Sequence, residues 1–532
     1  MSAVKSGLIG AAAVGGVIAV LFASGTVKLS GSEGAETSEQ ASDDSRDDGE
    51  VAKTRKGRKK RGRKGRRRRK KGGGDLESLG YIGAVEISEA DKGKSGTTIH
   101  DASRAHQGLS LYTPCAWGRK YRRASGGKVM REARLIDNAG EVVHAWTTDF
   151  VPNRRRGWAM AKLDAEGNLY AVNARSGLVK VDWDSNTLWS VKKGFHHDFN
   201  FGPDGKIYAL IEHGRQINFD GQRFNLLDNG VVILGPDGEV EDKFSFYDVL
   251  RELPELQEHI RRRLKRNAPR GGLAHDEDED GFDEEEGRIL FGRDMFHANT
   301  LNFATKTIDG VWNEGDIITS IREMNLVVVL DKDTHEPKWH WGQRELMRQH
   351  DPEQLDNGNL LVFDNGRGRH WSRVVEFDPV ASEIVWEYKH DDFFSGIRGL
   401  SQRLPNGGTL IVSSQRGRAF EVTTDGEIVW EYWSPDVLGG SLRVPFRMER
   451  LEGEALAFAQ KKLAEGKGNP AGASKFDAAA KPSADTTDEG AEAPDGDAKA
   501  PEEADAPAPE GEGAEASETP KAVEGEPAAK AE

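Results

Sequence analysis

The chain has 532 residues, of which 36% are hydrophobic, and it carries a formal net charge of −15 at pH 7. This hydrophobic content is low for a chain that is folded throughout, and the shortfall lies at the two ends, so we expect one folded domain between polar segments. The net charge averages blocks of opposite sign and therefore identifies no partner. Because Cys115 is the single cysteine, no intrachain disulfide can form.

Residues 1–25 are predicted to be a membrane anchor or a signal segment. Residues 7–24 form an uncharged run of eighteen residues, preceded only by Lys5, and a helix needs ~20 apolar residues to span a bilayer. A cleaved signal peptide is the alternative, because small residues suited to processing follow at 23–25. In both cases the segment would direct the chain to the export machinery. We therefore expect the folded domain outside the cytoplasm, in the periplasm or at the cell surface, with the membrane as a partner of the N-terminal helix.

Residues 26–74 are predicted to form a disordered linker that is first acidic and then polybasic. Between Lys53 and Lys71, fifteen of nineteen positions are Lys or Arg, and such a block repels itself. No aromatic residue interleaves these charges to stack on bases, so no nucleic acid is expected as a partner. A tether to anionic lipid or to an anionic envelope polymer, or a plain solvated linker, suits the composition better.

The C-terminal end is predicted to contain a helix and then a disordered tail. Met448, Leu451, Ala455 and Phe458 form one apolar stripe at helical spacing, which predicts a closing helix over 447–466. Residues 467–532 are rich in Ala, Pro and Glu and contain almost no large apolar residue. Such a segment cannot bury enough surface to offset its ordering entropy.

The middle of the chain, between about 106 and 435, repeats a unit of short strand patterns that ends in an aromatic residue. The closing residues are Trp146, Trp189, Phe244, Trp339, Trp386 and Trp430. Six units of roughly 40–50 residues, each with four strands, predict an all-β, six-bladed β-propeller over residues 75–466. A β-sandwich is the main alternative, but sandwiches do not require this repeat length.

An insert over residues 248–290 lengthens the third unit. We expect a helix over 248–266 and then an acidic loop, 276–287, that begins like a calcium loop. An EF-hand would have Glu at the twelfth position, where this chain has Gly287. A solvated acidic loop is therefore the favoured interpretation, and it could pair with the basic run 261–266.

Three successive units each start their first strand with a histidine, namely His197, His297 and His350. First strands line the central channel of a propeller, so the repeat predicts that the three imidazoles meet around its axis. The turns after the second strands carry Arg175, Arg215, Arg322, Arg367 and Arg416. Beside the histidines these arginines would form an electropositive bowl suited to an oxyanion such as a sulfate or phosphate ester.

Two kinds of chemistry could use the three histidines. One is a transition-metal site, since neutral imidazole is a common ligand, although neighbouring arginines would repel a cation. The other is nucleophilic group transfer, in which a neutral imidazole attacks and the remaining donors stabilise the developing charge. The second ring nitrogen of the nucleophile then needs an acceptor that fixes its tautomer.

These motifs resemble those of the bacterial aryl-sulfate sulfotransferases. The resemblance rests on residues 349–366 with their two Asp-Asn-Gly turns, the His-His-Asp-Phe run at 196–199, the His-Ala-Asn-Thr-Leu run at 297–301, and residues 135–146. It implies a six-bladed propeller that transfers a sulfuryl group from a phenolic sulfate ester to an acceptor phenol through a sulfohistidine. It also implies that no dissociable cofactor and no nucleotide donor (PAPS) is used.

Carried over by motif, the resemblance implies that His350 is the nucleophile. The substrate-binding residues would be His196, His197, His297, Asn299 and Arg322, and the partners would be a small aryl sulfate donor and a phenolic acceptor. Trp158, Phe393 and Phe394 could stack on the aryl group, although packing between blades is the commoner role for such residues. The alternative function is a non-catalytic propeller that binds anionic, sulfated ligands or glycans in the cell envelope.

Overall fold

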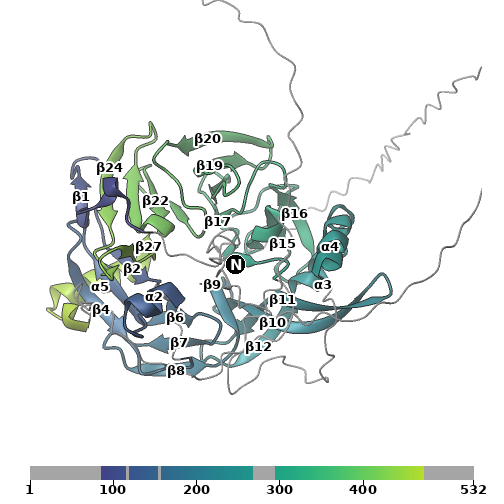
Figure 1. Cartoon of the computed structure of the whole chain (residues 1–532), viewed down its shortest axis with the longest axis horizontal. Helices are drawn as coiled ribbons and strands as arrows, with labels where there is room; N and C mark the ends of the chain where they lie inside the picture. Colours follow the sequence, from purple (N-terminus) through teal and green to yellow (C-terminus); the bar gives the residue numbers. More distant parts are fainter. Residues whose placement is uncertain (1–85, 116–118, 154–156, 268–293, 473–532) are drawn as a thin grey trace, which may run out of the picture. The chain divides into compact units, whose positions relative to one another are not determined.

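The computed structural model describes residues 86–115, 119–153, 157–267 and 294–472 (Figure 1). The predicted anchor, the polybasic linker, the acidic loop and most of the C-terminal tail lie outside these ranges and stay predictions. Within the described ranges, no helix is long and apolar enough to cross a membrane.

Six antiparallel sheets follow one another around a central axis, so the prediction of a six-bladed β-propeller is confirmed (Figure 1). From the axis outward, blade 2 comprises β5 (Trp158–Leu163), β6 (Leu169–Asn173), β7 (Gly177–Val181) and β8 (Thr187–Val191). Blade 3 comprises β9 (Phe195–Phe201), β10 (Ile207–Phe219), β11 (Gln222–Leu234) and β12 (Val240–Ser245). Blade 4 comprises β13 (Ala298–Phe303), β14 (Ile317–Ile321), β15 (Leu326–Leu330) and β16 (Pro337–Trp341). Blade 5 comprises β17 (His350–Gln354), β18 (Leu360–Asp364), β19 (Arg373–Asp378) and β20 (Glu383–Lys389).

Blades 1 and 6 are built from both ends of the described chain. Blade 1 starts at the axis with the late strand β27 (Phe446–Arg450) and continues with β2 (Ser110–Pro114), β3 (Glu132–Ile136) and β4 (Val142–Thr147). Blade 6 comprises β21 (Leu400–Arg403), β22 (Thr409–Ser413), β23 (Arg418–Val422) and β24 (Ile428–Trp433), and the early strand β1 (Gly96–His100) adds a fifth, outermost strand. Pairing of the late strand β27 with the early strand β2 closes the ring, and β1 covers the outer edge of β24.

The apolar content of each strand follows its burial within the blade. The second and third strands are largely buried, and β15, with Leu-Val-Val-Val-Leu, is buried along its whole length, as expected for strands covered on both faces. The outermost strands β8 and β12 have only exposed and half-buried positions. The six aromatic residues predicted to close the units all lie in outermost repeat strands: β4, β8, β12, β16, β20 and β24.

The apolar core lies between adjacent blades. One cluster joins residues of blades 4 and 5, where Trp341 stacks on Phe377 with ring centroids 3.9 Å apart. Trp146 and Trp430 are fully buried in two further clusters. Burying one large apolar side chain contributes about 1.5–3 kcal/mol, so these contacts hold the blades at fixed angles.

The prediction of one helix over 447–466 is wrong at its start. Residues Phe446–Arg450 form strand β27, and helix α5 spans Gly453–Ala464. Met448 is buried as a strand residue. The apolar stripe was ambiguous because a short apolar segment satisfies both strand and helix periodicity. The tail is also ordered further than predicted, since η4 spans Pro470–Gly472 and Asn469 accepts the Ala145 N–H at 3.1 Å.

The insert also differs from its prediction. It begins with two helices, α3 (Phe246–Leu250) and α4 (Pro254–Asn267), in place of one. Ser245 caps α3 by accepting the Asp248 N–H, and Pro254 starts α4, where its missing N–H costs nothing. Both helices pack against the long hairpin β10–β11, whose length the sequence did not indicate (Figure 1).

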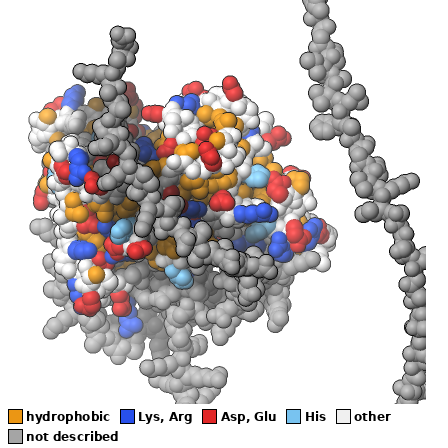
Figure 2. All heavy atoms as spheres, turned by 90° about the horizontal axis from the view of Figure 1, so that it is seen from above, with side chains coloured by type: hydrophobic (Ala, Val, Ile, Leu, Met, Phe, Trp, Pro, Cys, Tyr) orange, Lys and Arg blue, Asp and Glu red, His pale blue; other side chains and the backbone are white. Residues whose placement is uncertain are grey.

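The remaining described elements are short. They are η1 (Glu89–Asp91), α2 (Arg119–Ala124), η2 (Arg322–Met324), η3 (Ser414–Arg416) and the two-stranded pair β25 (Val437–Leu438) and β26 (Leu442–Arg443). On the side of the molecule seen in Figure 2, acidic and basic side chains are interspersed over the described surface. That surface therefore gives no sign of a partner of one charge.

Candidate active site at the propeller axis

The innermost strands of blades 3, 4 and 5 bring the predicted histidines together. The rings of His197 and His297 lie 4.6 Å apart between centroids, and those of His196 and His197 lie 4.9 Å apart. His350 is close enough that its charge affects the pKa of His197. The channel thus gathers four imidazoles from β9, the residue before β13, and β17.

The three strands do not present their histidines in the same register. His197 and His350 precede the last paired residue of their strands by four positions, whereas His297 precedes it by six. Asn299 occupies the matching place in β13, so the predicted equivalence of His297 is wrong. His297 still reaches the group because His197 and His297 adopt left-handed φ angles of 55° and 49° beside irregularities in strand pairing.

Asn365 fixes the tautomer of His350. The His350 ring is almost fully buried, and its Nδ1 lies 2.6 Å from Asn365 Oδ1. The Asn365 amide donates its Nδ2 hydrogens to the backbone carbonyls of Ser395, at 2.6 Å, and Arg398. Its oxygen must therefore face His350 and accept from Nδ1–H. The lone pair of a neutral His350 is left on Nε2, the nitrogen available for attack.

Asp294 holds His297 in the same way. Its Oδ1 accepts the His297 backbone N–H at 2.8 Å, and its Oδ2 lies 2.5 Å from His297 Nδ1. Burial alone would raise the pKa of Asp294, but the neighbouring His297 and its hydrogen bond hold that pKa below its usual range. The ionised carboxylate keeps the proton on Nδ1 and directs Nε2 of His297 away from it.

Two arginines supply positive charge at the histidines. Arg322, in η2, is buried, and Arg447 comes from β27 on the opposite side of the channel. Burial, followed by the charges of Arg322 and Arg447, lowers the pKa of His350 well below its ordinary value. Burial and the surrounding cationic groups act on His197 in the same direction. Both rings are therefore neutral near pH 7, which a nucleophilic imidazole requires.

His196 and Asn299 also lie in this region, but in different settings. His196 is buried, burial lowers its pKa, and its Nε2 has no hydrogen-bond partner among the described residues. Asn299 is fully buried and donates from Nδ2 to the Gln349 carbonyl at 3.0 Å. Asn299 thus fixes the backbone immediately before His350, and its direct contact with a substrate stays a prediction.

The positive charge of the predicted arginine bowl is largely compensated, because four of its five members pair with carboxylates, including Arg322 with Glu323 at 2.8 Å. Arg175 pairs with the buried carboxylate of Glu212. Arg215, which lies within β10 and not in a turn, binds Asp248 at 2.7 Å and is 3.2 Å from buried Asp228, and Arg416 binds Asp91 at 2.8 Å. These pairings neutralise the buried carboxylates of Glu212, Asp228 and Asp91, which would be costly to bury unpaired. Of these five arginines, Arg322 lies at the histidines: its backbone N–H donates to the His297 carbonyl at 3.3 Å, and its charge lowers the pKa of His350.

Two of the three aromatic residues proposed for the aryl group belong to the core. Trp158 and Phe393 are buried in inter-blade clusters. Phe394 is half-buried and lies 6.2 Å from the His370 ring, in the loops that carry Ser395 and Asn365. Stacking on an aryl group therefore stays a prediction for Phe394 only.

Among the described residues, no three His, Cys, Asp or Glu side chains are grouped so that they could hold a metal ion. A cavity of about 100 Å³ lies at the tip of the β10–β11 hairpin between Phe219, Phe224 and Arg261. That tip is far from the axis (Figure 1), so the histidines and not this cavity define the candidate site.

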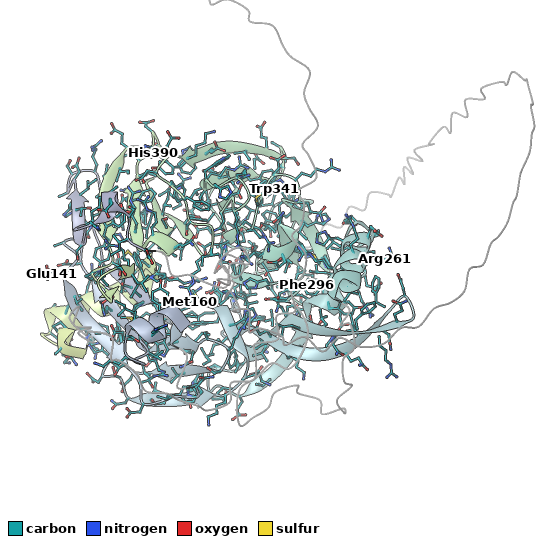
Figure 3. All side chains as sticks on the ribbon, viewed as in Figure 1. Glu141, Met160, Arg261, Phe296, Trp341 and His390 are labelled. Atoms are coloured by element: carbon teal, nitrogen blue, oxygen red, sulfur yellow. The ribbon has the colours of Figure 1, made fainter. Side chains whose placement is uncertain are left out.

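Sequence reasoning missed Asn365, Asp294 and Arg447. Asn365 stands in the second Asp-Asn-Gly turn after His350, and Asp294 stands three residues before His297, so both were within reach of a search for histidine partners. Arg447 had no comparable signal. It reaches the channel only because β27 closes the ring, where Figure 3 shows its neighbour Met160, 3.1 Å from Arg447 Nη1, near the axis.

The axis of the propeller thus gathers four histidines beside two buried arginines, Arg322 and Arg447. The chain belongs to the arylsulfotransferase (ASST) family, whose model matches residues 138–435. The match begins after β3 of blade 1 and ends after β24 of blade 6. It therefore includes all four histidines and excludes β27 with Arg447.

A comparison with curated protein sequences found no match. Similar solved structures include a protein of unknown function from Bacteroides caccae, with 14% identity, a TM-score of 0.38, and coverage of 61% of this chain and 93% of the other. Another is a streptogramin B lyase, with 10% identity, a TM-score of 0.35, and coverage of 69% and 97%. AztD from Citrobacter koseri has 9% identity, a TM-score of 0.34, and coverage of 65% and 99%. Scores at this level support no inference about function.

Proposed function

We propose that the protein transfers a sulfuryl group from an aryl sulfate ester to a phenolic acceptor through a sulfohistidine at His350. The observation that carries the proposal is the fixed tautomer of His350, in which Asn365 Oδ1 accepts from Nδ1–H at 2.6 Å and leaves Nε2 unprotonated. Membership of the ASST family supports the choice of sulfate over other oxyanions.

In the first half of the reaction, His350 Nε2 attacks the sulfur of the donor. The N–S bond forms while the S–O bond to the aryl group breaks, and the electron pair leaves on the phenolate oxygen, which takes a proton from solvent. The ring then carries positive charge, and Asn365 Oδ1 stabilises it by accepting from Nδ1–H. Arg322 and Arg447 offset the charge on the sulfuryl oxygens.

In the second half, the oxygen of the acceptor phenol attacks the same sulfur. The new S–O bond forms, the S–N bond breaks, and its electron pair returns to His350 Nε2, while the phenol proton leaves to solvent. His197 and His297, whose rings lie 4.6 Å apart beside His350, become donors to the sulfuryl oxygens on taking a proton. An approaching anion favours that protonation. No cofactor is needed in either half.

The test uses the purified full chain, 4-nitrophenyl sulfate as donor and phenol as acceptor. We expect release of 4-nitrophenol that depends on phenol, and radiolabelled sulfur that stays on the protein when phenol is omitted. His350→Ala should reduce turnover by about 10³-fold or more and abolish the label. Turnover that survives in His350→Ala, or turnover without any labelled protein, would contradict the sulfohistidine route. Binding of the donor without turnover would favour the non-catalytic alternative.

A further inference from the structure

The insert helix α4 is anchored firmly to the propeller. Leu256, Ile260 and Leu264 recur along one face of the helix and are buried in the cluster that joins blades 3 and 4. Near its start, Glu255 Oε1 lies 2.5 Å from Nε2 of His340 in β16. These contacts fix the orientation of α4 on the propeller. A side chain on a neighbouring face of the helix is therefore held in a defined position.

Arg263 of α4 reaches the turn that carries Arg322. Its Nη1 donates to Glu323 Oε2 at 3.0 Å, and its Nη2 donates to the Glu323 backbone carbonyl at 2.5 Å. Its Nε donates to Nε2 of His259, one turn earlier in the helix, at 2.9 Å. Three contacts to two residues fix the guanidinium, which is 23% exposed.

Glu323 in turn binds two arginines next to the nucleophile. Its Oε1 accepts from Arg322 Nη1 at 2.8 Å and from Arg348 Nη1. Arg348 lies two residues before His350, has a left-handed φ of 62°, and its carbonyl lies 3.2 Å from His350 Nδ1. One carboxylate therefore joins three guanidinium groups from α4, η2 and the start of β17, and two positive charges remain in excess.

We propose that Glu323 is a positioning residue that holds Arg322, whose backbone N–H donates to the His297 carbonyl at 3.3 Å, at the histidine group, and that Arg263 links the insert helix α4 to Glu323. The inference rests on the proposed function and deepens it, because it assigns a role to the insert that the repeat alone leaves unexplained. The ligand held at the site is an oxyanion, either free sulfate or the sulfate group of an ester.

The physical reason is the freedom of an arginine side chain. A long side chain loses much rotamer entropy when it is held in one place, and charge-assisted hydrogen bonds are among the contacts strong enough to compensate. Glu323 provides such a bond to Arg322 before the anion arrives. Arg263 supplies a second point of attachment for Glu323 through its backbone carbonyl, so the turn cannot swing away when Arg322 binds the anion.

The test compares Glu323→Gln and Arg263→Met with the wild-type chain in two independent measurements. The first is the affinity for inorganic sulfate by calorimetry, which needs no turnover. We expect Glu323→Gln to weaken it about tenfold, since hydrogen bonds to charged groups contribute amounts of that order, and Arg263→Met to weaken it less. The second is the pH profile of turnover, whose acid limb should move to higher pH as the Arg322 charge leaves His350.

Arg261→Met is the matched control on the same helix. Arg261 binds Asp220 on the hairpin at 2.6 Å, and Figure 3 shows it at the periphery, away from the axis. The Arg261→Met variant should keep wild-type sulfate affinity. Arg263→Lys should recover part of the affinity that Arg263→Met loses. If Glu323→Gln does not fold, the Arg263 variants decide the question.

Equal sulfate affinity in wild type, Glu323→Gln and Arg263→Met would overturn the inference, as would a wild-type chain that binds no sulfate. An equal loss in Arg261→Met would mean that α4 acts only through stability and would overturn it too. A chain that binds sulfate but forms no sulfohistidine would defeat the proposed function alone, because the affinity measurement would still report on Glu323.

Discussion

Two levels of the central channel respond to burial in opposite ways. At the start of the inner strands, burial and nearby cations lower the pKa values of His197 and His350. Further along β17, burial raises the pKa of Asp351 to about 7 and that of Glu353 to about 8. The cause is the same, because an imidazole is charged when protonated and a carboxylate when deprotonated, and burial disfavours either charged form.

The comparison explains how one channel serves two purposes. The histidines are neutral at neutral pH, and so available for attack, while the carboxylates accept backbone N–H groups of the next blade. Ser401 donates to Asp351 Oδ2 at 2.9 Å, and Arg403 donates to Glu353 Oε1 at 3.1 Å. Under the function proposed above, the first level supplies the nucleophile, whereas the carboxylates of the second level join blade 5 to blade 6.

After the loss expected from His350→Ala, the largest effect on the histidine level is expected from Asn365→Ala. The variant removes the acceptor of His350 Nδ1–H, so the ring can adopt the other tautomer and lose its lone pair on Nε2. Removing such a partner typically lowers activity by about 10²-fold, which steady-state kinetics with an aryl sulfate will measure. Asn357→Ala is the control, because Asn357 lies in the exposed first turn, where it donates to Glu376 at 2.7 Å and accepts the Asn359 N–H at 3.0 Å. Equal activity in the two variants would mean that Asn365 does not select the tautomer.

A smaller loss of activity is expected from Arg447→Met, which removes the cation contributed by β27. Its charge acts on His197, His350 and Asp351 alike, so it links the two levels. We expect kcat/KM to fall about tenfold, as for loss of one charged contact to an anion, and Arg447→Lys to recover part of it. A variant with wild-type kinetics would show that Arg322 alone neutralises the sulfuryl oxygens.

The pH dependence of turnover separates the levels further. Because the folded-state pKa of His350 lies below its ordinary value of 6.5, the nucleophile stays neutral as pH falls through 6.5. The acid limb of kcat/KM should therefore lie below pH 6.5, and in Arg322→Met it should move upward because a lowering charge is lost. An acid limb at or above pH 6.5 in the wild type would contradict the buried, neutral state of His350.

The smallest effect concerns stability at the carboxylate level. The folded-state pKa values of Asp351 and Glu353 are raised, so the stability they contribute is complete below their unfolded values near 3.8 and 4.5 and is lost as pH rises through about 7 and 8. Glu353→Gln keeps an acceptor for Arg403 and removes the titration. In urea unfolding it should match the wild type at pH 4 and exceed it at pH 8, by about 1 kcal/mol for each pH unit that separates the folded and unfolded pKa values. Glu383→Gln, at an exposed position of β20, should change neither value.

Prediction from sequence succeeded where the repeat carried the information. Six closing aromatic residues defined six blades, and each lies in the strand expected for it. The grouping of His197, His297 and His350 also followed from their places in successive units. The register of His297 in β13 could not be predicted in this way. Left-handed residues and irregular strand pairing change the direction of the chain without changing the spacing of residues in the sequence. The arginine bowl failed because buried acids distant in sequence, such as Glu212 beside Arg175, claim those side chains.

The sequence by itself determined the blade repeat, the strands at the axis and the histidines that start them, since alternation of apolar residues and turn signals are local properties. Only the tertiary structure decided which partners those histidines meet. Asn365 selects the His350 tautomer, Asp294 orients His297, Arg447 arrives from the strand that closes the ring, and Glu323 collects arginines from three segments. These contacts depend on packing between blades, and packing joins residues whose separation along the chain carries no signal of their contact.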